Sequence, residues 1–267
     1  IKCFTLKVIS LCTGSIDHIV FDIFFNFYVI KILELKHMLD ILKKTVAPLF
    51  SLFIFVFGSG FFLTLLSLTL NLHKEPPILI GAMTGMYYAG LVCGSFKIER
   101  FIVRVGHIRA FSTFASTLAV ISIFHGIFYN MPFWLVLRFI AGFGTAGVFV
   151  VIESWLLCNS TPLIRGRILS LYMMTFYAAQ AFGQLLINLD TTNDLLSYGI
   201  SAMLCSLSVI PLCMTYVSMP QFDEPSNMKL RNLYEKTTSG FLGCFFAGMA
   251  LSAIYALFPI LVSNIYH

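Results

Sequence analysis

The sequence predicts an all-α fold, namely a polytopic helical bundle embedded in a membrane. Three observations support it: 58% of the 267 residues are apolar, only 11% are charged, and the mean hydropathy is +0.90. Soluble domains carry about 25% charged residues, and a soluble core of this size cannot bury so much apolar surface. The composition therefore predicts a lipid bilayer as partner. The net charge of +5 is too modest to indicate nucleic-acid binding.

Seven apolar stretches are long enough to cross the hydrocarbon layer, which takes about 20 residues of helix. Backbone groups in lipid need hydrogen bonds within their own segment, and these stretches do not alternate as barrel strands do, so helices are expected. The predicted spans are 47–70, 77–96, 110–129, 132–152, 168–188, 196–217 and 240–262.

Basic residues in the connections predict the orientation of the bundle. The connections 71–76, 130–131 and 189–195 carry only Lys74, whereas the alternating connections carry nine basic residues. The positive-inside rule places the basic connections, and with them the N-terminus, in the cytoplasm. The nine residues are Lys97, Arg100, Arg104, Arg109, Arg165, Arg167, Lys229, Arg231 and Lys236.

The N-terminal segment does not fit the pattern of spans. Its apolar part is interrupted by Asp22, Lys31 and Glu34, and Met38 opens a short charged lead into the first span. We expect residues 1–37 to be translated upstream sequence or the edge of a fragment; an amphipathic helix on the membrane surface is the alternative. The predicted division is an N-terminal cytoplasmic or spurious segment 1–44, a six-helix half 45–217, a cytoplasmic linker 218–239 and a seventh transmembrane helix 240–267.

A basic, glycine-centred motif at 104–109 lies between the second and third spans. Gly106 can supply a tight turn between two helices. Arg104 and Arg109 can pair with acids or with the carbonyl ends of helices, and so latch a cytoplasmic gate. The alternative is a positive-inside loop without a further role.

Arg138 is the only formally charged side chain in the seven predicted spans, and a glycine-rich stretch, 139–144, follows it. A charge inside the membrane is costly and indicates function by default. We expect Arg138 to face a central cavity, with snorkelling to the outer interface as the alternative. Because the spans contain no acid, its partner is a carbonyl, a polar side chain, an anionic substrate or a residue of another segment.

Glu153 closes the fourth span, followed by Trp155, and Arg165 and Arg167 open the fifth. An ion-pair network between Glu153 and Arg104, Arg109 or Arg165 would bias the inner gate between two states. A capped, solvated helix end with an interfacial Trp155 is the alternative.

Three further observations concern helix packing. Gln180 and Gln184 stand one turn apart in the fifth span, where they can bind a substrate or a neighbouring helix; packing is favoured. The lone His125 is interpreted as a packed or interfacial residue rather than a proton relay. Small residues at four-residue spacing let helices approach closely. They are Gly81 with Gly85, Gly90 with Gly94, and Gly142 with Ala146.

These motifs resemble those of the major facilitator superfamily. The loop 104–109, Arg138 with its glycine-rich stretch, and Glu153 with the Arg-Gly-Arg at 165–167 are similar to motifs in that family. Residues 150–155 together with 104–111 look most like a bacterial subgroup, the YcaD-like transporters. The basic loop departs from the family pattern, because Val103 replaces the usual acid and Glu99 lies nearby.

The resemblance implies secondary active transport of a small solute by a rocker mechanism in a bacterial inner membrane. Family members have two six-helix halves that bind substrate between them. This chain would hold the N-terminal half and one helix of the second half. Its expected partners are the missing C-terminal half and a small-molecule substrate. Whether a proton is transported together with the substrate is left open. The substrate-cavity candidates are Arg138, Gln180 and Gln184; the cytoplasmic-gate candidates are Arg104, Gly106, Arg109, Glu153, Arg165 and Arg167.

Two alternatives to transport remain open. A remnant without transport activity is the first alternative, and a seven-span receptor or enzyme is the second. An enzyme is not expected, because the spans hold no cluster of catalytic groups and the chain has no phosphate-binding glycine loop. No cofactor and no metal are expected, since the seven cysteines are scattered and form no C-x-x-C pair.

Overall fold

The computed structural model describes residues 45–188, 194–215, 237–240 and scattered positions between 242 and 261. Every regular element in this part of the chain is a helix, which confirms the all-α class. Five of the helices are long and apolar enough to cross a membrane, so the chain is a multi-pass membrane protein. The predicted segment 1–44 and most of the predicted linker 218–239 lie outside the described residues, as does much of the predicted seventh span.

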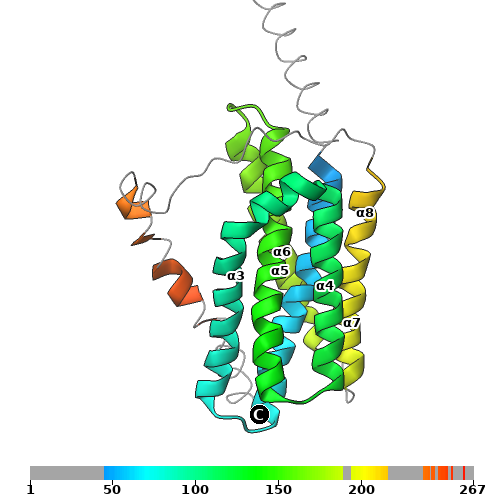
Figure 1. Ribbon diagram of the computed structural model, residues 1–267, viewed down its shortest axis with the longest axis vertical. Helices are drawn as coiled ribbons and strands as arrows, with labels where there is room; N and C mark the ends of the chain where they lie inside the picture. Colours follow the sequence, from blue (N-terminus) through cyan, green and yellow to red (C-terminus); the bar gives the residue numbers. More distant parts are fainter. Residues whose placement is uncertain are drawn as a thin grey trace, which may run out of the picture. The chain divides into compact units, whose positions relative to one another are not determined.

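The helices follow the predicted spans in order (Figure 1). The first span forms the helix Thr45–Leu72, drawn in blue. Gly106 alone separates the helices Pro77–Val105 and His107–Ile127. Asn130 caps the helix Met131–Cys158 by accepting a hydrogen bond from the Phe133 amide at 3.2 Å. These elements are α3 (Pro77–Val105), α4 (His107–Ile127), α5 (Met131–Cys158), α6 (Arg165–Leu185), η1 (Leu186–Asn188), α7 (Asp194–Leu207) and α8 (Val209–Cys213).

The second helix is longer than the sequence predicts. The predicted span ends at Phe96 and a loop is predicted from 97 to 109, but α3 continues to Val105. Its last turns stay helical because Ile98 and Ile102 are buried against the bundle while Arg100, between them, is exposed. The predicted loop was therefore wrong in extent, and the turn consists of Gly106, whose φ of 87° favours glycine.

A one-residue turn interrupts the sixth predicted span, which still forms one candidate membrane span, Leu195–Cys213. α7 ends at Leu207, a turn follows at Ser208, and α8 begins at Val209. Pro211 explains the break, because proline has no N–H to donate to the carbonyl of Leu207 and its ring crowds the preceding turn. The Ser208 hydroxyl donates to the carbonyl of Cys205 at 2.6 Å, which satisfies one of the acceptors at the end of α7.

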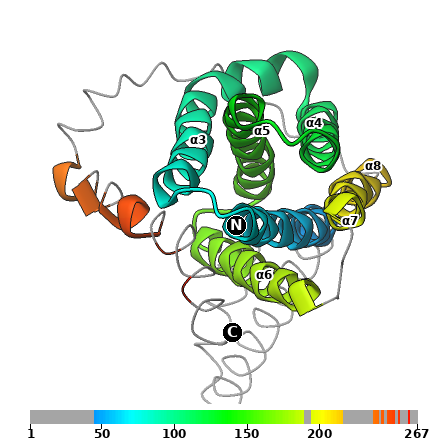
Figure 2. The same cartoon turned by 90° about the horizontal axis from the view of Figure 1, so that it is seen from below.

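α3 and α5 pack closely side by side (Figures 1 and 2). A methyl group added at Gly142 would overlap the carbonyl oxygen of Tyr87, and one added at Gly90 would overlap the carbonyl oxygen of Phe139. The two backbones therefore meet directly at this crossing, as the small residues predicted. By contrast, a methyl group at Gly81 or Gly85 would meet no atom within 4 Å among the described residues.

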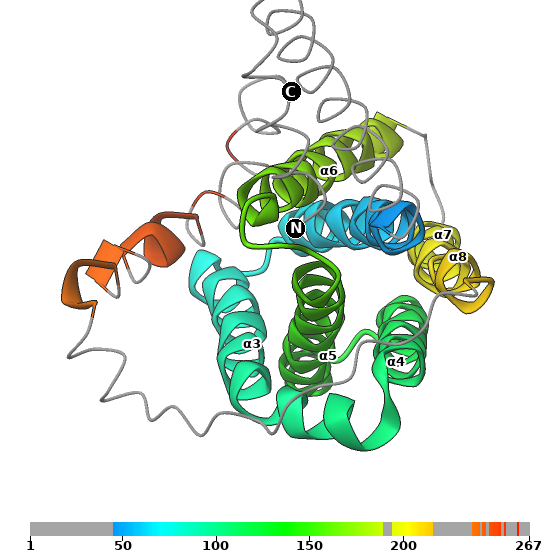
Figure 3. The same cartoon turned by 90° about the horizontal axis from the view of Figure 1, so that it is seen from above.

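The helix Thr45–Leu72 lies between α6 and the α3–α5 pair, with α7 beside it, in both end views (Figures 2 and 3). It is the most buried of the five candidate spans. Hydrogen bonds tie it to two neighbours: the Ser201 hydroxyl donates to the carbonyl of Gly58 at 3.0 Å, and the Thr64 hydroxyl donates to Gln184 Oε1 at 2.8 Å. This first helix is therefore the centre of the bundle.

A polar contact joins two connections at the end of the bundle opposite Gly106. Tyr129 stacks on His73 with ring centroids 4.3 Å apart, and its hydroxyl donates to Glu75 Oε1 at 3.0 Å. Burial, and then the hydrogen bond and charge of Glu75, raise the pKa of Tyr129 to about 12. The hydroxyl therefore stays protonated, and able to donate to Glu75, throughout the physiological pH range.

Candidate functional site

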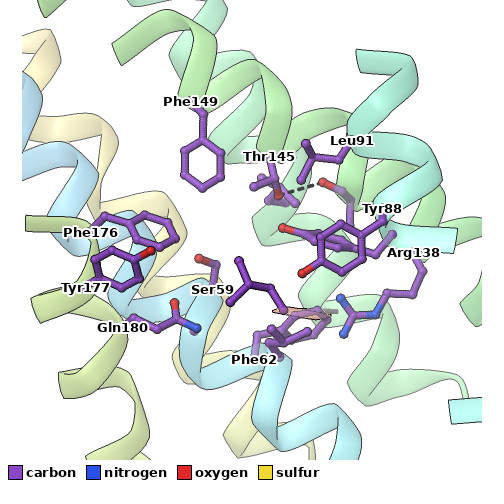
Figure 4. A pocket seen from close by; sticks show the side chains of 16 residues that line it. Ser59, Phe62, Tyr88, Leu91, Arg138, Thr145, Phe149, Phe176, Tyr177 and Gln180 are labelled. Carbon is purple, nitrogen blue, oxygen red and sulfur yellow. Dashed lines mark hydrogen bonds between the residues drawn. The ribbon is translucent and has the colours of Figure 1, made fainter. Parts of the chain in front are cut away.

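A cavity of about 220 Å³ opens between the helix Thr45–Leu72, α3, α5 and α6 (Figure 4). Six of its 16 lining residues are aromatic, and Arg138 is the one charged side chain among the described residues that line it. An aromatic wall with a few polar groups is typical of a small-molecule site. The aromatic residues are Phe62, Tyr87, Tyr88, Phe149, Phe176 and Tyr177, and the uncharged polar ones are Ser59, Thr145 and Gln180.

Arg138 lies deep in the bundle and does not snorkel to the interface. Only 2% of its surface is exposed. Its guanidinium carbon lies 4.7 Å from the ring centroid of Phe62 and 5.7 Å from that of Tyr87, so the cation contacts the faces of two aromatic rings. Figure 4 shows the guanidinium directed over Phe62. Sequence reasoning expected Arg138 at a central cavity, and the structure places it on the cavity wall.

The guanidinium has hydrogen-bonding capacity that no described residue uses. Arg138 Nε and Nη2 are buried and have no hydrogen-bond partner among the described residues. These two nitrogens lie on the same edge of the guanidinium, the edge that binds a carboxylate through two parallel hydrogen bonds. A buried charge without such partners is costly, so the arrangement favours an anionic ligand.

A cluster of buried rings shares Phe62 with Arg138. His125 of α4 contacts Phe62 with ring centroids 5.2 Å apart, Trp134 at 5.0 Å and Tyr198 at 6.2 Å. The charge of Arg138 acts on His125. The first helix, α5 and α7 therefore each contribute a ring that contacts His125 of α4. We name His125, Trp134, Tyr198 and Phe62 the histidine cluster.

The two glutamines of α6 have different surroundings although they stand one turn apart. Gln180 lines the cavity and lies against Gly60 of the first helix. Gln184 does not line it, because its Oε1 accepts the hydrogen bond from Thr64 at 2.8 Å. The two predicted residues therefore differ: Gln180 lies on the cavity wall, and Gln184 joins α6 to the first helix.

Replacing each glutamine with leucine is expected to separate these roles. Gln184→Leu leaves the Thr64 hydroxyl without its side-chain acceptor and should lower the free energy of unfolding by about 1 kcal/mol. Gln180→Leu should leave stability nearly unchanged and alter solute affinity. Thermal unfolding in detergent and equilibrium binding measure the two effects. Equal destabilisation by both substitutions would contradict the assignment.

The gate candidates lie at one end of the bundle, where the α3–α4 turn and the α5–α6 connection meet (Figure 1). Arg104, Arg109, Arg165 and Arg167 are exposed there, and Glu153 is half-buried. The Glu153 carboxylate interacts with the Tyr172 hydroxyl of α6. His107 of α4 also contacts Trp155 of α5, with ring centroids 5.6 Å apart. The network of Glu153 with the arginines stays a prediction.

Sequence reasoning missed most of the cavity wall. The partners of Arg138, namely Phe62 and Tyr87, come from two other helices, and His125 was interpreted as a packing residue. A chain with 28 phenylalanines and 11 tyrosines offers no signal that separates cavity-facing rings from lipid-facing ones. The adjacent pair Tyr87 and Tyr88, two polar-tipped rings in mid-span, was the one visible clue.

Comparisons with known proteins agree with the fold and the motifs. The chain is 28% identical over 187 residues to an uncharacterized MFS-type transporter, YcaD, of Escherichia coli O45:K1, and this match covers 69% of the chain and 49% of the relative. It is 27% identical over 203 residues to YcaD of Escherichia fergusonii, covering 75% of the chain and 53% of the relative. The chain spans about half the length of these curated relatives.

A family model described as Major Facilitator Superfamily matches residues 49–267, which is most of the chain. The matched region includes every described helix from Thr45–Leu72 to α8, except the first four residues of the first one. It also contains the cavity, Arg138 and every gate candidate. This chain therefore belongs to the major facilitator superfamily.

Proposed function

We propose that this chain forms one half of a secondary active transporter that moves a small solute across a bacterial inner membrane. Membership of the family supports membrane transport and points to a transporter rather than an enzyme. The observation that carries the proposal is the buried guanidinium of Arg138 on the wall of an aromatic cavity, with two nitrogens that lack hydrogen-bond partners among the described residues. Charges at this depth in a membrane are functional by default.

The proposed mechanism is rocking of two halves around a central solute site. Residues 45–217 supply one half, and a C-terminal half supplies the remaining wall of the cavity. The half described here moves as a unit because the first helix is hydrogen-bonded to both α6 and α7, and α3 is locked to α5 at the glycine crossing. A rigid half and a fixed site are what this mechanism requires.

The proposed substrate carries an anionic group that pairs with Arg138. No acidic side chain is among the described residues that line the cavity, so a cationic solute would lack a counter-charge here. The aromatic rings would hold an apolar body, and Gln180, Ser59 and Thr145 add uncharged polar groups. The cavity thus suits a small organic anion rather than a cation.

The proposed gate lies on the cytoplasmic side, with the N-terminus on the same side. Basic residues gather at the α3–α4 turn and the α5–α6 connection, which are at one end of the bundle (Figure 1). Arg104, Arg109 and Arg165 are exposed at that end, so their side chains can reach or leave Glu153 as the gate closes and opens, while the helices of this half stay together. Ion pairs formed in one state and broken in the other would bias the two populations.

Solute uptake by vesicles that contain the purified protein tests the proposal. Small organic anions should enter above the level of protein-free vesicles, and Arg138→Ala should reduce their uptake by at least about 30-fold, since truncating one partner of a buried charged pair costs 2–5 kcal/mol. Arg100→Ala, an exposed arginine outside the cavity, is the matched control. Absence of uptake for any solute would support the inactive-remnant alternative, and uptake of anions that survives Arg138→Ala would disprove the anion site.

A further inference from the structure

The histidine cluster holds a polar atom that the fold leaves without a partner. Only 2% of the surface of His125 is exposed. Its Nδ1 lies 2.9 Å from the carbonyl oxygen of Ile121, one turn earlier in α4. Because a carbonyl only accepts, Nδ1 carries the hydrogen, and Nε2 is left as a bare acceptor. Nε2 is buried and has no hydrogen-bond partner among the described residues.

The groups around His125 include one fixed charge. α5 contributes Trp134 and the guanidinium of Arg138, and α7 contributes the titratable Tyr198. The first helix contributes Phe62, which has no titratable group. On α4 itself the neighbouring polar side chain is Ser122, whose hydroxyl donates to the carbonyl of Tyr198 at 2.9 Å. The charge that His125 experiences here is therefore the positive charge of Arg138.

We propose that His125 Nε2 is a proton-binding site that is coupled to anion binding at Arg138. The inference rests on the proposed function, because it requires an anion on the cavity side of the guanidinium. With Arg138 uncompensated, a second positive charge in this apolar cluster is repelled. When a carboxylate neutralises Arg138, that repulsion falls, so Nε2 binds a proton more readily than in the empty site, while Nδ1 keeps its hydrogen bond to Ile121.

The coupling makes the loaded site carry one anion and one proton. The proton comes from water and forms one N–H bond at Nε2, which converts the neutral imidazole into a cation. Linkage is reciprocal, so protonation of His125 strengthens anion binding by the same factor by which the anion favours protonation. A rocking transporter that carries both ligands in this state performs proton–anion cotransport, driven by the proton gradient.

Tryptophan fluorescence offers a direct test, because a protonated imidazole in contact with an indole quenches its emission. The chain has two tryptophans, and Trp134 lies 5.0 Å from His125 between ring centroids. In Trp155→Phe protein in detergent, the emission of Trp134 is titrated between about pH 5 and 8, with and without cyclohexanecarboxylate. We expect the carboxylate to move the midpoint of quenching to higher pH. The neutral cyclohexanecarboxamide should leave it in place.

Equilibrium binding to the unsubstituted protein measures the same linkage without any tryptophan substitution. Affinity for cyclohexanecarboxylate should rise about 5- to 100-fold as the pH falls across the same range. His125→Gln should remove this pH dependence, because glutamine does not titrate. His107→Gln is the matched control, since His107 is also buried and contacts the other tryptophan, and it should leave the pH dependence intact.

The outcomes separate this inference from the proposed function. Carboxylate binding that depends on Arg138 but not on pH would overturn the proton site and leave the anion site standing. Absence of carboxylate binding at every pH would overturn both. A pH dependence that persists in His125→Gln and disappears in His107→Gln would show that His107, and not His125, binds the proton. That result would also overturn the inference.

Discussion

Replacing Gly142 with alanine is expected to disrupt the packing of α3 against α5 and to lower the free energy of unfolding by about 3 kcal/mol. The added methyl group would overlap the carbonyl oxygen of Tyr87, which belongs to the backbone of α3 and cannot rotate away. The two helices would have to separate along the crossing. Because Tyr87 and Arg138 stand on these two helices, the cavity wall should be disturbed as well.

Gly85→Ala is the matched control for this effect. A methyl group at position 85 would meet no described atom within 4 Å, although Gly85 stands on α3 only five residues before Gly90. Alanine improves helix propensity by about 1 kcal/mol at either position, so the difference between the two variants isolates the clash. Thermal unfolding in detergent measures it. If Gly142→Ala proved as stable as Gly85→Ala, the direct backbone contact would be refuted.

Arg138→Met is expected to abolish anion binding while making the fold more stable. Methionine fills a similar space against Phe62 and Tyr87 without a buried charge. Exchange of buried charged groups for apolar ones of similar volume is often stabilising by 1–4 kcal/mol. At about 2–4 °C per kcal/mol, the thermal midpoint should rise by several degrees. If the variant is more stable but no longer binds the anion, Arg138 serves ligand binding rather than the stability of the fold.

Arg138→Lys supplies the comparison for this substitution. It keeps a positive charge but has no planar edge with two parallel donors. Weaker anion binding than in the unsubstituted protein, with stability near that of the original, is the expected result. Binding is measured by equilibrium methods and stability by thermal unfolding in the same detergent. A fall in stability with Arg138→Met would show that the guanidinium supports the fold, contrary to its unpartnered nitrogens.

The positions of the helices followed from the sequence, but their arrangement did not. Long apolar runs fix where a chain crosses a membrane, and the described spans form at the predicted places. Composition cannot tell which helix is central, because surfaces that face lipid and surfaces that face protein are both apolar. The central place of Thr45–Leu72 therefore appears only in the structure. The break before Pro211 was visible in the sequence but was not predicted.

The candidate site was predictable where a residue type is rare in its surroundings. Arg138 stands out because it is the one charge in the predicted spans. Gln180 and Gln184 look equivalent in the sequence, and only the position of Thr64 on another helix distinguishes them. His125 looked isolated for the same reason, since Trp134, Tyr198 and Phe62 are distant from it along the chain or lie on other helices. Such contacts depend on how the helices pack against one another, and the residues near each position in the sequence do not reveal this packing.

The uninterrupted helix α3 connects the cavity wall with the gate. Tyr87 on the cavity wall and Arg104 at the gate stand on the same helix, about 25 Å apart at 1.5 Å per residue. The glycine crossing lies close to Tyr87 and fixes α3 to α5 there, with no side chain between the backbones to absorb movement. A solute that displaces Tyr87 would therefore move α3 and α5 together, and Arg104 would move with them.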